Sequence, residues 1–325
     1  MNNMNVNEIV MKTNINRLLR SGLLLMLFVL PVACSDWNEP EPVDLGINSA
    51  KDQNPELWAR YMQVLHTYKQ SKHYIAYARF DNSTENPVNE GDYLRSLPDS
   101  LDIVTLGNPG QISDFDREDI PLLQEKSTRV LYLVDYAAQA ATLADVAALG
   151  TWLDQVITEA AELKLDGFAF TGIPLYIGTD AELKAHKEKS RLIVSKLSTA
   201  VGEDKLLVFE GNPAFVDDAD LDKLNYIVLN TADLTNVTDL KLQVAGVLAN
   251  SILPKGNLLL AARIGEQITD EASVKQDAVT LMTNRVASLG PLGGLGIYAI
   301  GKDYYSSKMN YEITRTAIQL MNPSK

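Results

Sequence analysis

Short apolar segments alternate with helical stretches along most of this chain, and this alternation constrains the fold more than any other feature. Eight segments have the character of buried strands: 73–80, 101–106, 129–134, 165–170, 205–209, 226–230, 257–262 and 294–300. Apolar residues recur at helical spacing in 56–69, 142–163, 181–201, 238–251 and 271–288, and Asp180, Asp239 and Asp270 stand where helix N-caps or first-turn acids belong. Apolar strands separated by helices are typical of a parallel, helix-covered sheet, so we predict an α/β fold.

The number of strands predicts a closed (β/α)8 barrel that forms a single domain. Eight strand–helix units fit the roughly 250 residues typical of that fold. The alternative is an open, doubly wound sheet, which would bind a nucleotide at a glycine-rich turn. The one candidate, Gly294-Leu295-Gly296-Ile297-Tyr298-Ala299, follows a helix and begins a strand, the reverse of a dinucleotide site. The sequence has no P-loop, GxSxG or HExxH motif, and we expect no cofactor.

The charge balance and the residue counts exclude several classes of function. The chain has 42 acidic residues against 29 Lys and Arg, a formal net charge of −13. A nucleic-acid-binding protein needs a basic face for phosphate, so nucleic acid is excluded as a partner. One cysteine and three histidines exclude a disulfide framework and leave little for a metal centre, so we expect no metal.

The N-terminal segment has the pattern of a bacterial export signal. Lys12, Arg17 and Arg20 precede an apolar run over 23–30, much shorter than the roughly 20 residues that a membrane-spanning helix needs. The single cysteine, Cys34, follows the run and resembles the cysteine of a lipobox, which becomes lipidated. The alternative is an ordinary signal peptide followed by an incidental free cysteine.

These features predict a lipoprotein in three parts. They are a signal peptide over 1–33, a lipidated Cys34 with an acidic, proline-containing tether over 34–53, and the barrel over 54–325. An acidic segment directly after the cysteine resembles the export signal of surface-displayed lipoproteins in Bacteroidota-type bacteria. We therefore expect the protein at the outer membrane, facing the cell exterior and bound to the membrane only through its lipid. Anchoring on the periplasmic face is the alternative.

Four segments, spread in order along the chain, carry a resemblance to a known family. They are 96–104 at the second strand, 163–168 at the fourth, 293–298 at the eighth and 311–323 in the closing helix. Together they resemble the barrel of glycoside hydrolase family 18, in the lipoprotein branch related to endo-β-N-acetylglucosaminidases. The resemblance implies the same (β/α)8 barrel that the alternation predicts.

The family's catalytic motif is degenerate in this chain. Its fourth strand ends in a pattern of the form D-G-x-D-x-D-x-E, in which the last Glu is the general acid and the preceding Asp orients the substrate's N-acetyl group. Asp166 and Gly167 match the first two positions, but the three later carboxylates fall on Ala169, Thr171 and Ile173. None of these side chains has a titratable proton near neutral pH. The resemblance therefore implies a pseudoenzyme.

The alternative is that another carboxylate replaces the missing acid, and Glu210 at the end of the fifth strand is the best candidate. Asp135, at the end of the third strand, would be its partner, because strand ends of such a barrel meet at the mouth where active sites form. We favour polar binding roles for both, because a relocated acid also requires a re-aimed substrate.

Sugar binding needs less than catalysis, namely an aromatic platform and planar polar side chains. The segments after the strands supply such groups, each of which can equally be a turn or capping residue. The ligand-binding candidates are Asp135, Thr171, Tyr176, Glu210, Asn212, Asn230, Asp233, Arg263, Asp303 and Tyr304.

Three functional hypotheses follow. The first is a non-catalytic, surface-anchored barrel that binds N-acetylglucosamine-containing glycans, such as N-glycans, for uptake by an outer-membrane importer and companion glycosidases in polysaccharide utilisation. The second is an active endo-β-N-acetylglucosaminidase with a relocated acid. The third is a protein-interaction module that kept the barrel without sugar binding.

Overall fold

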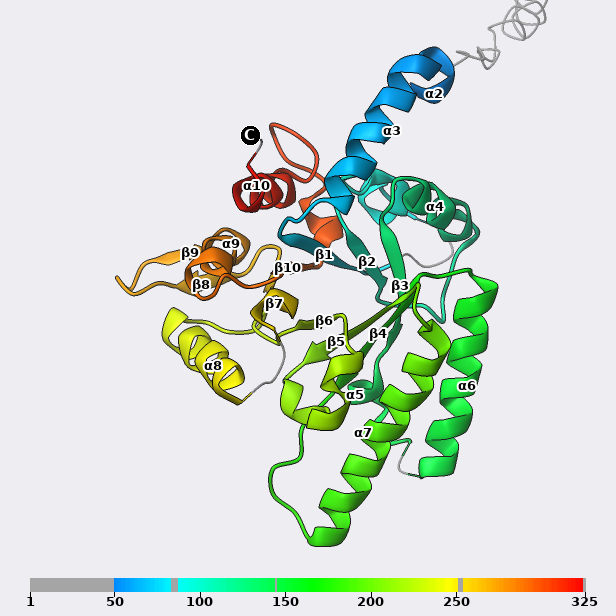
Figure 1. The fold of residues 1–325 in the computed structure, drawn as a ribbon. Helices are drawn as coiled ribbons and strands as arrows, with labels where there is room; N and C mark the ends of the chain where they lie inside the picture. The colour runs from blue at the N-terminus through cyan, green and yellow to red at the C-terminus, as the bar shows by residue number, and fades with distance from the viewer. Residues whose placement is uncertain (1–49, 83–86, 144, 251–253, 324–325) are drawn as a thin grey trace, which may run out of the picture. The chain divides into compact units, whose positions relative to one another are not determined.

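Eight parallel strands close into a barrel in the computed structural model, which describes residues 50–82, 87–143, 145–250 and 254–323 (Figure 1). The barrel strands are β1 (Ile75–Phe80), β2 (Ile103–Leu106), β3 (Arg129–Val134), β4 (Gly167–Gly172), β5 (Leu206–Gly211), β6 (Tyr226–Val228), β7 (Leu258–Arg263) and β10 (Gly294–Tyr298). Each strand pairs in parallel with the next, and β10 pairs with β1 to close the ring. The predicted (β/α)8 barrel is therefore confirmed, and it lies within Leu57–Lys325.

Helices cover the outer surface of the ring, and α6 and α7 lie side by side (Figure 1). The helices from α3 on are α3 (Pro55–Gln70), α4 (Asp114–Glu125), α5 (Tyr136–Gln139), α6 (Val146–Glu162), α7 (Asp180–Val201), α8 (Val237–Asn250), α9 (Ala278–Ser288) and α10 (Glu312–Met321). A short helix before the barrel unit, α2 (Ala50–Gln53), belongs to the N-terminal unit. None of the helices in the described part of the chain has the length and apolar character needed to cross a bilayer. The predicted signal peptide, Cys34 and most of the tether lie outside the described residues.

The helix predicted over 271–288 is wrong in its first part. Residues 271–277 belong instead to an antiparallel hairpin of β8 (Gln267–Thr269) and β9 (Lys275–Asp277). The carboxylate of Asp270 accepts hydrogen bonds from the backbone N–H groups of Ala272 and Val274, each at 2.9 Å, so it stabilises the hairpin turn rather than a helix. Asp277 is the actual N-cap of α9, through a 2.8 Å bond from the Thr280 N–H.

Side chains of the barrel strands alternate between two apolar layers, because successive residues of a strand face opposite sides. In β4, Ala169 belongs to the cluster inside the barrel, together with Tyr77 and Tyr298. Phe168 and Phe170 belong to the larger cluster between the sheet and the helices. The positions of the degenerate motif that replace carboxylates, 169 and 171, are therefore lumen positions.

Two glycines allow neighbouring strands to approach closely at the beginning of β4 and β10. Gly167 has φ +139°, and a Cβ atom there would lie 2.0 Å from the carbonyl oxygen of Leu206 in β5. Gly294 has φ +157°, and its Cβ would lie 2.0 Å from the carbonyl oxygen of Ile75 in β1. Both positions exclude any side chain, so barrel closure depends on glycine at two separate places in the ring.

A polar network joins the end of α3 to the N-terminal ends of the strands. His73 Nε2 lies 3.0 Å from Asp102 Oδ1, and Asp102 Oδ2 accepts a 2.8 Å bond from the Ala76 N–H. The Lys69 ammonium donates to the carbonyl of Leu101 and to the Thr128 hydroxyl, both at 2.6 Å. The hydrogen bond to Asp102 raises the pKa of His73 above its usual value, and burial lowers that of Lys69 to about 8.

We expect Gly167→Ala to lower the free energy of unfolding by about 3 kcal/mol or more, because the new Cβ meets backbone and the φ angle is unfavourable. Gly150→Ala in α6 is the matched control. Its Cβ would meet nothing nearer than 3.8 Å, and alanine is the better helix former by about 1 kcal/mol. Urea unfolding followed by circular dichroism measures both, and equal effects of the two substitutions would contradict the closure argument.

The His73–Asp102 pair should make stability depend on pH. Because the folded pKa of His73 is raised, its stabilising contribution is complete below the unfolded value of about 6.5 and is lost as pH rises through the folded value. The difference in unfolding free energy between wild type and His73→Gln should therefore shrink as pH rises from 5.5. Asp102→Asn, which removes the partner charge, should flatten this dependence, and an unchanged slope in that variant would count against the pair.

Candidate functional site

A buried carboxylate lies in the upper lumen of the barrel. Glu210, at the end of β5, has only 3% of its side chain exposed. Its Oε1 accepts a hydrogen bond from the Tyr77 hydroxyl of β1, and its Oε2 accepts one from the Tyr298 hydroxyl of β10 at 2.8 Å. The guanidinium of Arg79, also from β1, lies 3.5 Å from Oε2. Glu210 therefore links three strands across the inside of the ring.

Arg79 connects Glu210 to a second carboxylate at the mouth. Its Nη2 lies 3.7 Å from Oδ2 of Asp135, the residue that follows β3 and caps α5. Asp135 Oδ1 accepts a 2.6 Å bond from the Thr171 hydroxyl, whose oxygen in turn accepts a 3.0 Å bond from the Ala137 N–H. We call Tyr77, Arg79, Asp135, Thr171, Glu210 and Tyr298 the mouth cluster.

A second arginine, Arg263 of β7, lies close to the ring of Tyr298. The guanidinium carbons of Arg79 and Arg263 lie 5.7 Å and 5.8 Å from the centre of the Tyr298 ring, within cation–π range. Arg263 Nη2 also lies 3.4 Å from Oδ1 of Asp233, whose side chain is 86% exposed. Arg79, Asp135 and Arg263 are partly exposed, so the cluster presents planar charged groups to solvent at the mouth.

The electrostatics of the mouth cluster make Glu210 an acceptor. Burial, followed by the negative charge of Glu210, raises the pKa values of Tyr77 and Tyr298 well above their usual range, so both hydroxyls keep their protons. Burial opposes the charge of Arg79, but the neighbouring acidic groups, Glu210 first and then Tyr298 and Asp135, together outweigh it and raise the pKa of Arg79. Donors thus point at both oxygens of the Glu210 carboxyl group, which accepts a hydrogen bond from each tyrosine hydroxyl.

The first residues of the family motif serve the framework. Asp166 lies just before β4, where its Oδ2 accepts bonds from the Val130 N–H and the Gln124 side-chain amide, both at 2.9 Å. This is the N-terminal end of the strand, opposite the mouth. Asp166 and Gly167 therefore hold strands together and would take no part in chemistry at the C-terminal ends.

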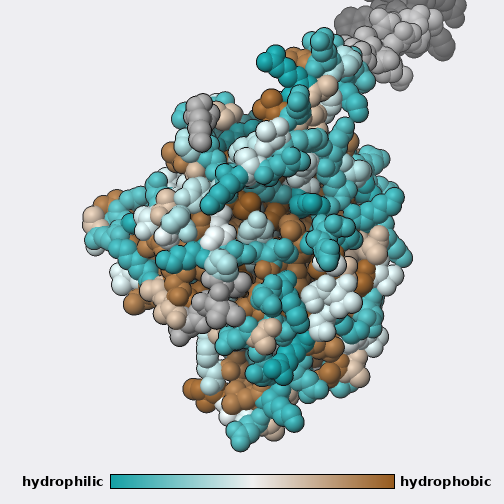
Figure 2. Space-filling model, in the orientation of Figure 1, coloured by the Kyte–Doolittle hydropathy of each residue, from teal (hydrophilic) through white to brown (hydrophobic). Residues whose placement is uncertain are grey.

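The three replaced positions lie where the motif predicts, and none carries an acid. Ala169 is fully buried in the lumen, and Thr171 is occupied by its bonds to Asp135 and Ala137. Ile173 follows β4 and is 68% exposed. Leu175 and Ile177 of the same loop are also exposed, and Figure 2 shows apolar surface near the beginning of α7 at the lower edge of the view.

The structure does not bring all the predicted ligand-binding residues together. Asp303 is buried and accepts bonds from the backbone N–H groups of Ile313 (3.2 Å) and Thr314 (2.8 Å), so it holds the first turn of α10. The Tyr304 ring packs edge-on against the rings of Tyr305 and Tyr311. These contacts give Asp303 and Tyr304 structural roles in the connection between β10 and α10.

Tyr176 and Asn212 line a separate cavity of about 560 Å³. It lies between the loop after β4, the two 3-10 helices η3 (Pro213–Phe215) and η4 (Asp218–Lys223), and α8. Asn230 lies next to it, because its Oδ1 accepts a 2.8 Å bond from Gln243, one of the lining residues. We call this cavity the rim pocket. It is lined by Tyr176, Asn212, Pro213, Ala214, Asp218, Leu221, Leu242, Gln243, Gly246 and Val247.

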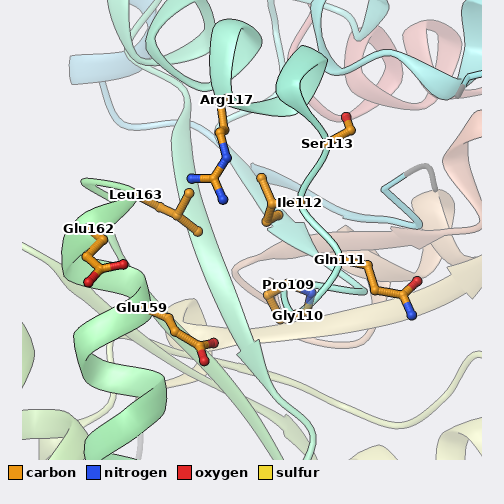
Figure 3. A pocket seen from close by; sticks show the side chains of 9 residues that line it. All are labelled: Pro109, Gly110, Gln111, Ile112, Ser113, Arg117, Glu159, Glu162 and Leu163. Atoms are coloured by element: carbon orange, nitrogen blue, oxygen red, sulfur yellow. The ribbon is translucent and has the colours of Figure 1, made fainter. Parts of the chain in front are cut away.

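Another hollow, of about 590 Å³, lies between the β2–α4 segment and the end of α6 (Figure 3). The Arg117 guanidinium extends toward it from α4, and Glu159 and Glu162 line it from α6 (Figure 3). Glu159 is already engaged, because it accepts a 2.7 Å bond from the Tyr132 hydroxyl. In the described part of the chain, no group of three His, Cys, Asp or Glu side chains is arranged to hold a metal ion.

The sequence did not single out Tyr77, Arg79 and Tyr298, the residues that surround Glu210. One signal was available. Arg79 is a charged residue in the otherwise apolar run Ile75–Phe80, two positions after Tyr77 and therefore on the same face of the strand. A charge inside a lumen-facing strand needs a partner, and a carboxylate at another strand end supplies it.

Comparisons with known proteins agree with this architecture. Residues 38–145 match the profile of glycoside hydrolase family 18, BT1044-like, so the family resemblance is confirmed in that segment. Among solved structures, a BT1044 variant superposes with a TM-score of 0.67 at 16% identity, covering 85% of this chain and 96% of that chain. No curated protein matches the chain.

Two enzymes of known organism superpose as well. An endo-β-N-acetylglucosaminidase from Cordyceps militaris has a TM-score of 0.59 at 18% identity, covering 81% of this chain and 96% of that chain. Catalytic domain 2 of a Group II chitinase from Ostrinia furnacalis has a TM-score of 0.59 at 10% identity, covering 78% and 97%. At such identities the likeness establishes the fold.

Glu210→Gln should lower the free energy of unfolding by about 2–4 kcal/mol, because it leaves Arg79 without its buried counter-charge. Asp233→Asn is the matched control, a carboxylate-to-amide change beside Arg263 on an 86% exposed side chain, and should cost no more than about 0.5 kcal/mol. Chemical unfolding of the three proteins measures this, and a Glu210→Gln effect as small as the control's would show that the mouth cluster does not stabilise the barrel.

Proposed function

We propose that this chain, a barrel of the family 18 glycosidase type, is a glycan-binding protein without hydrolytic activity. The observation that carries the proposal is the replacement of the acid. The motif's final position is Ile173, an exposed apolar side chain, and the lumen carboxylate nearby, Glu210, is surrounded by donors. A glycosidase of either common type needs a carboxylic acid to protonate the leaving oxygen, and the motif's acid position offers none.

Glu210 lies beside Thr171, one of the replaced motif positions, so it is the side chain to compare with a catalytic acid. Its Cα pairs with that of Thr171 across the β4–β5 ladder. Its side chain, however, points at Tyr77, Tyr298 and Arg79 inside the lumen and is 3% exposed. A proton donor must reach the glycosidic oxygen within hydrogen-bond distance, and a side chain held in this way would first have to leave three partners.

The groups at the mouth suit recognition of hydroxyl groups. Arg79 and Asp135 form one charged pair at the edge of the lumen, and Arg263 and Asp233 form another. Planar guanidinium and carboxylate groups bind vicinal hydroxyls through paired hydrogen bonds, and Tyr298 lies between the two guanidinium groups. These pairs are partly exposed, so a ligand replaces water rather than a buried partner.

N-acetylglucosamine-containing glycans, including N-glycans, are the ligand class that we propose. A variant of the Cordyceps militaris endo-β-N-acetylglucosaminidase forms a complex with fucosyl-N-acetylglucosamine-Asn, and it has the same fold as this chain at 18% identity. We further propose that Cys34 carries a lipid that anchors the protein at the outer membrane. There it would bind glycans for an importer and companion glycosidases.

We expect the purified protein to release no glycan from an N-glycosylated glycoprotein, under conditions in which the Cordyceps militaris enzyme releases it, because Ile173 occupies the motif's acid position and Glu210 is held by its partners in the lumen. Release is measured by mass spectrometry of the free glycans. Calorimetry with free N-glycans and N,N′-diacetylchitobiose tests binding in parallel.

Glycan release by the wild-type protein would overturn the proposal and favour the enzyme hypothesis. Glu210→Gln, with its fold verified by circular dichroism, would then establish whether Glu210 is the acid. Neither release nor binding would favour a protein-interaction module.

A further inference from the structure

We propose that the rim pocket is a second carbohydrate subsite, built to hold one or two neutral pyranose rings outside the barrel axis. The inference rests on the proposed glycan-binding function and adds a location to it. The pocket lies on elements after β4, β5 and β6, and it shares no residue with the mouth cluster. Its volume of about 560 Å³ falls within the range of small-ligand sites.

The pocket has an exposed aromatic ring whose position is fixed. Tyr176 belongs to the loop between β4 and α7, and its side chain is 68% exposed. Its hydroxyl accepts a 3.1 Å hydrogen bond from the side-chain amide of Asn212, which holds the ring at the edge of the cavity. A flat apolar face with a tethered hydroxyl is the surface on which the C–H face of a sugar ring packs.

Asn212 is itself held in place by the fold. Its Oδ1 accepts a 3.1 Å bond from the Ala214 N–H, as the N-cap of η3. The amide therefore connects the Tyr176 ring to the backbone after β5. An aromatic platform fixed before the ligand arrives loses less conformational entropy on binding than a mobile one.

The remaining polar groups of the pocket favour a neutral, hydroxylated ligand. Gln243 donates its amide N–H to Asn230, which leaves its carbonyl oxygen available as an acceptor. Asp218 is exposed, and no ion pair joins it to any residue that the structure describes. A carboxylate and an amide oxygen accept hydrogen bonds from sugar hydroxyls, whereas a carboxylate repels an anionic ligand.

Small residues keep the pocket open where larger ones would fill it. Gly246 lies within α8, where a glycine costs about 1 kcal/mol of helix stability relative to alanine. A Cβ atom built at Gly246 would meet no heavy atom within 4 Å, so the space beside it is open. Leu221, Leu242 and Val247 add apolar walls, which complete the mixture of apolar and polar contacts that sugar rings require.

Filling the pocket from α8 is the sharpest test, because it removes no existing contact. Gly246→Leu places a side chain in the open space, and Ala245→Leu adds the same bulk at an exposed neighbour that does not line the pocket. We expect Gly246→Leu to weaken binding of a trimannosyl N-glycan core or of N,N′-diacetylchitobiose at least tenfold, and Ala245→Leu to change it less than twofold. Calorimetry on the folded proteins measures both.

Removal of the platform is an independent test. We expect Tyr176→Ala to weaken binding of the same probes at least tenfold. Tyr305→Ala, at an equally exposed tyrosine (71%) outside the pocket, should change it less than twofold. Reduced binding in both pocket variants, with both controls intact, supports the subsite.

The negative outcomes separate the two proposals. If the wild type binds a probe and both pocket variants bind it within twofold of wild type, the subsite is overturned while the glycan-binding function stands. Weaker binding by Arg263→Ala would then assign the ligand to the barrel mouth. If the wild type binds neither probe, both proposals are overturned.

Discussion

The buried carboxylate of Glu210 is the interaction on which the interior of this barrel depends. It joins β5 to β1 and β10 through Tyr77, Tyr298 and Arg79, so it couples strands that are far apart in the sequence. A charge removed from water is tolerated only when its partners replace the lost hydration. Here two hydroxyls and a guanidinium surround the Glu210 carboxylate.

The matching and the replaced residues of the degenerate motif lie toward opposite ends of β4. Asp166 and Gly167 remain because they act at the opposite end of β4, where Gly167 admits the backbone of β5 and Asp166 binds the start of β3. Ala169 and Thr171 fit the lumen, and Ile173 is exposed to solvent, so their replacement leaves the ring closed.

The rim pocket is formed in part by the loop in which the family motif ends. The loop after β4, which carries Ile173 in place of an acid, also carries Tyr176, whose ring is held by Asn212 at the edge of a cavity. Loops at the C-terminal ends of barrel strands vary without affecting closure of the sheet. The segment that carries Ile173 can therefore also carry the platform that we propose for binding.

The sequence by itself determined the barrel, because eight apolar runs separated by helical periodicity have few other ways to bury their apolar surface. It also determined the absence of acids at 169, 171 and 173, since residue identity is enough for that. It did not determine the hairpin of β8 and β9, where Asp270 binds backbone groups of a turn in place of a helix. Only the tertiary structure decided the roles of Glu210, Asp303 and Tyr176. The Glu210 carboxylate accepts hydrogen bonds across the lumen, and the Asp303 carboxylate accepts them from the first turn of α10. The Tyr176 hydroxyl accepts one from a side-chain amide of a different loop. These partners are 10 to 133 residues away in the chain, so no local pattern specifies them.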